Sequence, residues 1–166
     1  MRRKDREIKD FEKMISILDS CDCCRIGLVD GDEAYIVPLN FGYEQQNENL
    51  VLYFHSAKEG RKIDLINNQK SVSFQMDTKH KLVGGKAACD YTYFYQCIMG
   101  KGCISMIQDR EEKIHGLNQI MRHYSENKNW EYKEDVYKRQ ILSIVCIVSE
   151  LLIPDISTDI STRSGF

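Results

Sequence analysis

The residues best suited to chemistry lie in one short segment, Phe54-His-Ser-Ala-Lys-Glu-Gly-Arg-Lys62. An apolar run ends there and a helical pattern begins, so the segment marks a strand-to-helix junction. Its polar groups include three cations and one hydroxyl, from Lys58, Arg61, Lys62 and Ser56. The first turn of a helix presents unpaired N–H groups and a partial positive charge, and Gly60 permits close backbone approach. The segment therefore predicts a phosphate site, unless these charges are simply solvated on a helix surface.

A second segment, Tyr35-Ile-Val-Pro-Leu-Asn-Phe41, is apolar apart from Asn40. Such a surface, with its backbone groups and one amide, suits a flat apolar ring with polar edges. The alternative is that these side chains are barrel core. Because Pro38 cannot donate a ladder hydrogen bond, we expect an edge strand, a bulge, or a position beside something other than a strand.

Hydrophobic periodicity and turn signals predict the elements that position these two segments. Helices are expected at 7–20, at 58–68, and from an N-cap at Asp109 to about residue 124. Strands are expected at 23–29, 34–40, 50–55, 71–76, 89–99 with a continuation at 103–107, and 141–148. Asp30-Gly31-Asp32 reads as a tight turn, 44–49 and 77–88 as loops, and 100–102 as a bend. About six strands in roughly antiparallel order, with helices between them, suggest a mainly β domain, a small barrel with flanking helices on its outside. Periodicity alone leaves an α+β fold as the alternative to the β-barrel.

Composition excludes several classes of function. The 166 residues suit one domain, and the net charge of −2 provides no global field for nucleic acid or an anionic membrane. No apolar run approaches the roughly 18 residues of a membrane span. The charged start, residues 1–6, is unlike a secretory signal. We therefore expect a cytoplasmic protein that binds neither nucleic acid nor membrane.

The seven cysteines favour reduced thiols, because their number is odd and no export signal is visible. Cys21-Asp-Cys-Cys24 is similar to one half of a zinc knuckle. A zinc site normally needs a second spaced pair of Cys or His, which does not follow here. We therefore predict no metal, and interpret these cysteines as small apolar residues entering a strand.

Four motifs, in this order, resemble the 5-nitroimidazole-resistance (Nim) type of the pyridoxamine 5′-phosphate oxidase-like, FMN-binding split-barrel family. They are residues 35–43, 52–66, 72–74 and 95–102. The resemblance covers about residues 1–134 and implies a six-stranded antiparallel split β-barrel over 1–148. Residues 149–166 are then a tail, and the sequence departs from the family pattern from about residue 135.

The resemblance also implies a homodimer with FMN at the interface. The residues implied at FMN are Val37, Pro38, Leu39 and Asn40 along the isoalloxazine, Phe54, His55 and Ser56 beside the ribityl phosphate, Gly60, Arg61 and Lys62 at the phosphate, and Cys97 on a strand from the partner chain. Lys58 is added to the residues predicted at the phosphate because it lies in the same strand-to-helix junction. Where the family usually has Tyr-Arg-Ser-Val, this chain has Tyr95-Gln-Cys-Ile98, and a thiol donates a weaker hydrogen bond than a hydroxyl.

His55 has two interpretations. In the Nim type a histidine at this position lies near the flavin and is proposed to act in catalysis, where a side chain that titrates near neutrality could supply a proton. Alternatively, His55 only hydrogen-bonds the cofactor.

The leading functional hypothesis is an FMN-dependent reductase of small aromatic or nitroaromatic compounds, with NAD(P)H as a candidate electron donor. No Gly-x-Gly-x-x-Gly element is present, so a nicotinamide would visit the flavin only transiently. The alternative is a non-catalytic flavin or haem carrier or sensor, with His55 or His80 as a haem ligand. Pyridoxamine-phosphate oxidase activity ranks third, because the basic C-terminal motif of those oxidases is not visible.

Overall fold

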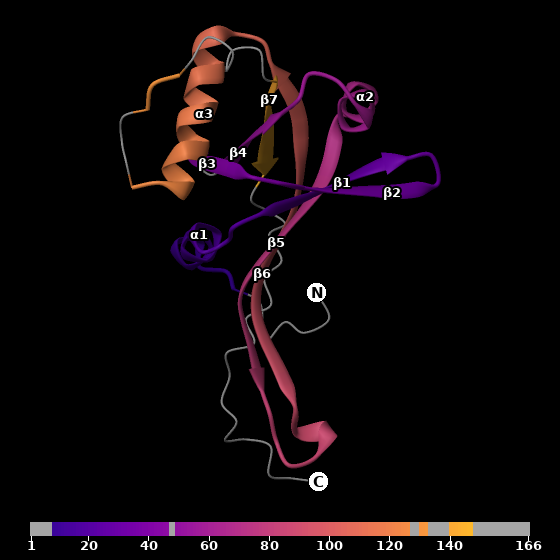
Figure 1. Ribbon diagram of the computed structural model, residues 1–166, viewed down its shortest axis with the longest axis vertical. Helices are drawn as coiled ribbons and strands as arrows, with labels where there is room; N and C mark the ends of the chain where they lie inside the picture. The colour runs from indigo at the N-terminus through magenta and orange to yellow at the C-terminus, as the bar shows by residue number, and fades with distance from the viewer. Residues whose placement is uncertain (1–7, 47–48, 127–129, 133–139, 148–166) are drawn as a thin grey trace. The chain divides into compact units, whose positions relative to one another are not determined.

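A computed structural model describes residues 8–46, 49–126, 130–132 and 140–147 (Figure 1). Its elements, in chain order, are α1 (Phe11–Asp19), β1 (Cys24–Asp30), β2 (Glu33–Leu39), β3 (Phe41–Gln46), β4 (Asn49–Ser56), α2 (Arg61–Asn68), β5 (Ser71–Val83), the 3₁₀ helix η2 (Ala88–Asp90), β6 (Thr92–Ile107), α3 (Arg110–Tyr124) and β7 (Gln140–Ile147). The described residues divide into two compact units. The first contains 8–21 and 76–98, and the second contains the others. The predicted tail, 149–166, lies outside the described residues.

The described strands form one sheet in the order β2-β1-β5-β6-β7-β4-β3, with β2 and β3 at its edges. The paired registers are antiparallel, which confirms the prediction of a mainly β, antiparallel fold with flanking helices. The sheet has seven strands rather than six. The additional strand is β3, which pairs with β4 from Phe41↔Phe54 to Gln46↔Asn49. Its polar second half had the composition of a loop.

Strand β4 is buried on both faces, as expected for a central strand, and lies between β3 and β7. Successive side chains of a strand point to opposite faces. On one face Leu52 and Phe54 belong to the most deeply buried residues of the second unit. The other face meets α3 in an apolar cluster of Val51, Tyr53, Ile107, Leu117, Ile120 and Ile141. Strand β7 completes this layer, with His55 of β4 opposite Ile141.

Helix α3 approaches β3 closely at Gly42. A Cβ added to Gly42 would lie 2.2 Å from the carbonyl carbon of Gln119 and 2.2 Å from the amide nitrogen of Ile120. At its start the helix is capped by Asp109, whose carboxylate accepts from the amides of Glu111 (2.8 Å) and Glu112 (2.9 Å). The predicted N-cap is therefore confirmed.

The prediction for 77–88 was wrong, because β5 continues to Val83. Its outer residues are largely exposed, so they lack the alternation of buried and exposed positions that identifies a strand. The predicted bend at 100–102 is also absent, since β6 runs unbroken through it. Gly100 instead leaves room for a ring, because a Cβ there would lie 2.5 Å from Cζ of Phe74.

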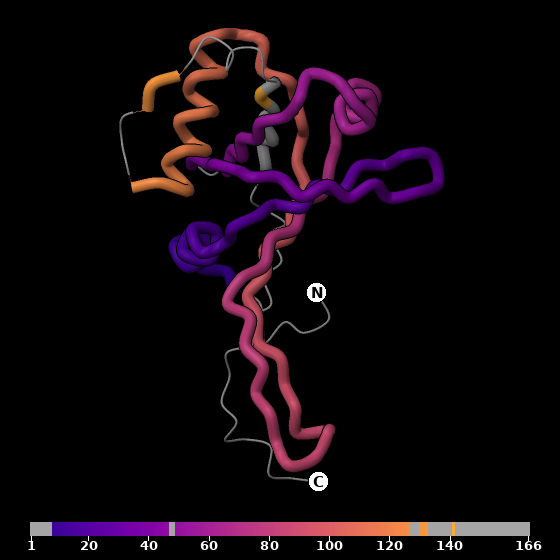
Figure 2. The backbone as a smooth tube through the Cα atoms, in the orientation of Figure 1, coloured from indigo at the N-terminus to yellow at the C-terminus, as the bar shows by residue number. Residues whose placement is uncertain are grey.

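The first hairpin matches its prediction closely. Strands β1 and β2 form a hairpin (Figure 2), in which they pair from Cys24↔Leu39 to Asp30↔Glu33. In its two-residue turn Gly31 has φ 63°. Pro38 lies in β2, an edge strand of the described sheet, as its missing N–H requires. In the described part of the chain, every helix is too short or too polar to cross a membrane.

Candidate functional site

The N-terminus of α2 has no side-chain cap. Its N-cap is Gly60, whose φ of 118° favours glycine, and no side chain among the described residues hydrogen-bonds the helix there. The carbonyl of Gly60 accepts from the amides of Ile63 (2.8 Å) and Asp64 (3.2 Å). The first amides of a helix have no intrahelical acceptor, and here no side chain in the described part of the chain replaces one. This end of α2 is therefore suited to an anion.

Lys62, in the first turn of α2, is the least exposed of the three cations predicted to bind the phosphate. Its side chain is half-buried, whereas Lys58 and Arg61 are exposed. Burial lowers the pKa of Lys62 from its usual value. No carboxylate among the described residues pairs with its ammonium. A partly desolvated cation without a described counter-ion would be stabilised by a bound anion.

Arg61 is bound by the β1–β2 hairpin. Its Nε donates to Oδ2 of Asp30 at 2.6 Å, and one terminal nitrogen lies 2.5 Å from the same oxygen. The guanidinium also lies 4.8 Å from the ring centroid of Tyr35 and 3.8 Å from a carboxylate oxygen of Glu33. Sequence reasoning recognised Asp30 only as a turn residue, because no local signal connects it with Arg61.

The predicted ring-facing residues occupy the end of edge strand β2 and the residue after it. Val37 and Leu39 are half-buried, while Pro38 and Asn40 are exposed. An edge strand leaves one row of N–H and C=O groups unpaired. These backbone groups are available to the polar rim of a ring, whereas the side chain of Asn40 hydrogen-bonds Tyr124.

Of the remaining predicted site residues, three lie on the two faces of β4 and one lies in the first compact unit. Phe54 and Ser56 share one face of β4 and are buried, at 0% and 7% exposed. The pleat directs His55 to the opposite face, where it is half-buried. Cys97 lies in the first unit and is 4% exposed. The second unit thus contains the other eleven predicted site residues, from Val37 to Lys62.

Comparison with known proteins identifies the family. The family model for pyridoxamine 5′-phosphate oxidase matches residues 10–151, which is most of the chain. The chain belongs to this family. The resemblance inferred from the four motifs is thereby confirmed. A search of curated proteins found no match.

Solved structures agree with membership of the pyridoxamine 5′-phosphate oxidase family. One is a candidate 5-nitroimidazole antibiotic resistance protein from Bacteroides thetaiotaomicron, with 32% identity, a TM-score of 0.75, and coverage of 89% of this chain and 84% of that one. The flavocytochrome Anf3 of Azotobacter vinelandii has 14% identity, a TM-score of 0.71, and coverage of 100% and 86%. A FAD- and haem-binding protein of Mycobacterium smegmatis has 11% identity, a TM-score of 0.73, and coverage of 90% and 73%. The last two share the fold.

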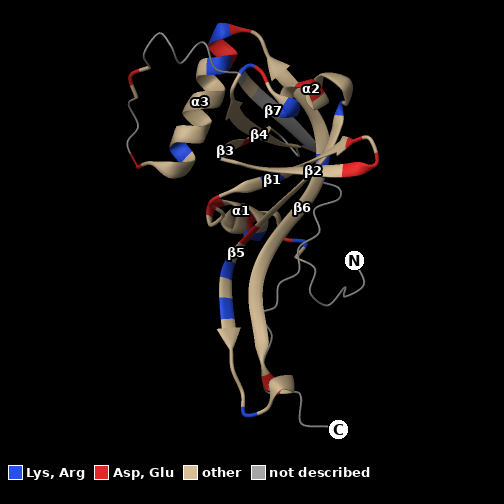
Figure 3. Cartoon of the chain, turned by 45° about the vertical axis from the view of Figure 1, so that its right-hand side comes forward, with Lys and Arg blue, Asp and Glu red and all other residues tan. Residues whose placement is uncertain are grey.

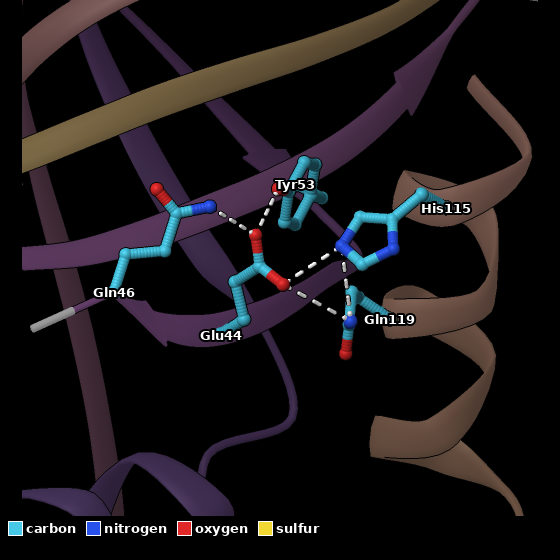
Figure 4. A network of polar contacts seen from close by, with 5 residues as sticks. All are labelled: Glu44, Gln46, Tyr53, His115 and Gln119. Carbon is cyan, nitrogen blue, oxygen red and sulfur yellow. Dashed lines mark hydrogen bonds and ion pairs between the residues drawn. The ribbon is translucent and has the colours of Figure 1, made fainter. Parts of the chain in front are cut away.

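This family member also has a polar network between α3 and the sheet (Figure 4). Oε1 of Glu44 accepts from the hydroxyl of Tyr53 at 2.5 Å and from the amide of Gln46 at 2.6 Å. Oε2 of Glu44 lies 2.7 Å from Nε2 of His115 and 3.3 Å from Nε2 of Gln119. The two partners on α3 are one helical turn apart, so they reach the same carboxylate together.

The environment of Glu44 favours its ionised form. Burial acts to raise the pKa of this carboxyl, but the hydrogen bonds from Tyr53, His115 and Gln46 outweigh burial and lower it. Burial and the adjacent Glu44 carboxylate both raise the pKa of Tyr53, so its hydroxyl remains a donor. The network ties α3 to β3 and β4, and its described members include no Ser, Thr or Cys that could act as a nucleophile.

The described residues contain no group of three or more side chains able to hold a metal ion. Of the cysteines that suggested a knuckle, Cys21 and Cys24 are buried and Cys23 is half-buried.

Proposed function

We propose that this chain binds FMN, with the phosphate at the first turn of α2 and the ring along the end of β2. The observation that carries the proposal is Lys62, a half-buried cation with a lowered pKa and no carboxylate partner among the described residues. It lies beside a helix terminus without a side-chain cap. A dianionic phosphate would satisfy both features. Family membership supports a flavin as the group that carries this phosphate.

We propose further that the protein is an NAD(P)H-linked reductase of small aromatic or nitroaromatic compounds. Bound FMN would accept a hydride and pass electrons on. The chain's own residues would hold the phosphate through Arg61 and Lys62 and support the ring through the Val37–Asn40 segment. His55 would act as a proton donor or hold the cofactor. The name and 32% identity of the Bacteroides thetaiotaomicron protein support nitroaromatic substrates.

A homodimer is part of the proposal. In the second unit Val29, Ile36 and Met99 are 68%, 63% and 39% exposed, which is unusual for large apolar side chains. Ile36 lies on edge strand β2, next to the Val37–Asn40 segment. A second copy that covers these residues would also exclude water from a ring bound there.

The visible spectrum of the purified protein tests the cofactor. The absorption of oxidised flavin supports FMN, whereas a Soret band would favour the haem-binding alternative. Arg61→Ala combined with Lys62→Ala should abolish FMN retention, while Lys70→Ala, which removes an exposed cation just beyond α2, should preserve it. A wild-type protein that takes up neither FMN nor haem would refute both cofactor hypotheses.

Turnover separates a reductase from a carrier. With FMN bound and oxygen excluded, NAD(P)H should bleach the flavin, and a nitroimidazole should reoxidise it. The same cycle in His55→Ala distinguishes its two roles, because retained FMN with lost turnover indicates proton donation. Bound FMN that NAD(P)H does not reduce would favour the non-catalytic alternative.

A further inference from the structure

The turn between β1 and β2 is acidic and lies against the cation that begins α2. Asp30, Asp32 and Glu33 fall within four consecutive residues of this turn, which appears red in Figure 3. Asp30 takes both the Nε and a terminal nitrogen of Arg61 on one oxygen, at 2.6 and 2.5 Å. Among the described residues, the ion pairs of Arg61 go to Asp30 and Glu33.

Other contacts fix this arrangement. The side-chain amide of Gln69, at the C-cap of α2, donates to the carbonyl of Val29 and accepts from its amide, each at 3.1 Å. Val29 directly precedes Asp30, so α2 is attached to the hairpin at both ends. Tyr35 provides a ring beneath the guanidinium of Arg61. Asp30 and Arg61 therefore meet through several contacts rather than through two flexible side chains alone.

We propose that Asp30 competes with the phosphate of the ligand for Arg61, and thereby lowers the preference of the site for phosphorylated over unphosphorylated flavins. This inference rests on the proposed FMN site. The Asp30 carboxylate engages the two guanidinium N–H groups that a phosphate would use in a bidentate contact. It also places a negative charge where a dianion must approach. FMN binding then exchanges one anion for another at Arg61, which weakens the gain from this arginine.

The size of the effect follows from the exposure of the pair. Side chains of Arg61 and Asp30 are 54% and 32% exposed. Exposed ion pairs contribute little, so removing the competitor should strengthen FMN binding by about two- to fivefold at low salt. The effect should diminish as salt screens the charges. Riboflavin lacks the phosphate, so its affinity should not change.

The test compares Asp30→Asn with Asp32→Asn, which removes the same charge from the same turn without an ion pair to Arg61. Apoprotein is titrated with FMN and with riboflavin, and flavin fluorescence gives each dissociation constant. We expect Asp30→Asn to raise the ratio of FMN to riboflavin affinity two- to fivefold, by the ion-pair estimate above, and Asp32→Asn to raise it less. In an Arg61→Ala background the effect of Asp30→Asn should disappear.

Three results would overturn the inference while FMN binding stands: equal ratios for the two variants, an effect that persists without Arg61, or weaker FMN binding by Asp30→Asn. The last result would indicate that Asp30 positions Arg61 for the phosphate. A wild-type protein that binds neither FMN nor riboflavin would instead overturn the proposed function, and this inference with it.

Discussion

Gly42→Ala should be among the most destabilising single substitutions in the second unit. The added Cβ would lie 2.2 Å from two backbone atoms of α3 and 2.4 Å from the carbonyl oxygen of Gln119. Carbon atoms normally pack at about 3.5–4 Å, so α3 and β3 must separate by more than about 1 Å. Overpacking costs about 1–3 kcal/mol when side chains can adjust, and backbone atoms cannot rotate away. We therefore expect Gly42→Ala to lower the free energy of unfolding by about 3 kcal/mol or more.

Gly27→Ala is the matched control, because its Cβ would meet only the carbonyl oxygen of Ser73, at 3.7 Å. We expect it to change stability by less than about 1 kcal/mol. Denaturant unfolding gives both free energies from the midpoint and slope of each curve. For a chain of this size the Gly42→Ala loss corresponds to a fall in Tm of roughly 6–12 °C. If both variants unfolded at the same denaturant concentration, the close approach of α3 to β3 would be refuted.

Three further predictions concern the polar network at α3 and Lys62, one of the residues proposed to bind the phosphate. Because the folded-state pKa of Glu44 is lowered, its carboxylate stabilises the fold above the unfolded-state pKa, and this contribution is lost as pH falls through the folded value. Glu44→Gln should therefore remove part of the acid dependence of the unfolding free energy, measured from pH 7 to about pH 3. Tyr53→Phe should cost about 1–3 kcal/mol and move the remaining acid transition to higher pH, since Glu44 loses its hydroxyl donor. Lys62→Met should leave thermal stability without ligand unchanged or higher, yet reduce stabilisation by added FMN; unaltered stabilisation by FMN would contradict a role for Lys62.

Features set by neighbouring residues could be predicted from the sequence. The cap at Asp109 acts on amides two and three residues away. The tight turn depends on the positive φ of Gly31, and the edge position of β2 follows from the missing N–H of Pro38. Each signal acts within a few residues, so it is visible in the order of residues alone.

Features set by distant residues could not be predicted. Glu44 and His115 meet across 71 positions, and Arg61 reaches Asp30 across 31. The glycines at 100 and 102 predicted a bend. The structure instead shows that position 100 lies against the ring of Phe74, where a Cβ would clash. Periodicity also requires a buried face, which the exposed outer part of β5 lacks.

The two halves of the proposed FMN site are connected through β1. One half is the first turn of α2, and the other is the end of β2, which pairs with β1 along its length. Gln69 attaches α2 to β1, because its side-chain amide hydrogen-bonds the backbone of Val29. Segments that the sequence separates by some twenty residues therefore share one support, which presets the spacing between phosphate and ring. A preset spacing reduces the ordering cost of binding, so Gln69→Ala, which removes both hydrogen bonds to the Val29 backbone, should weaken FMN binding in a fluorescence titration without removing a contact with the ligand.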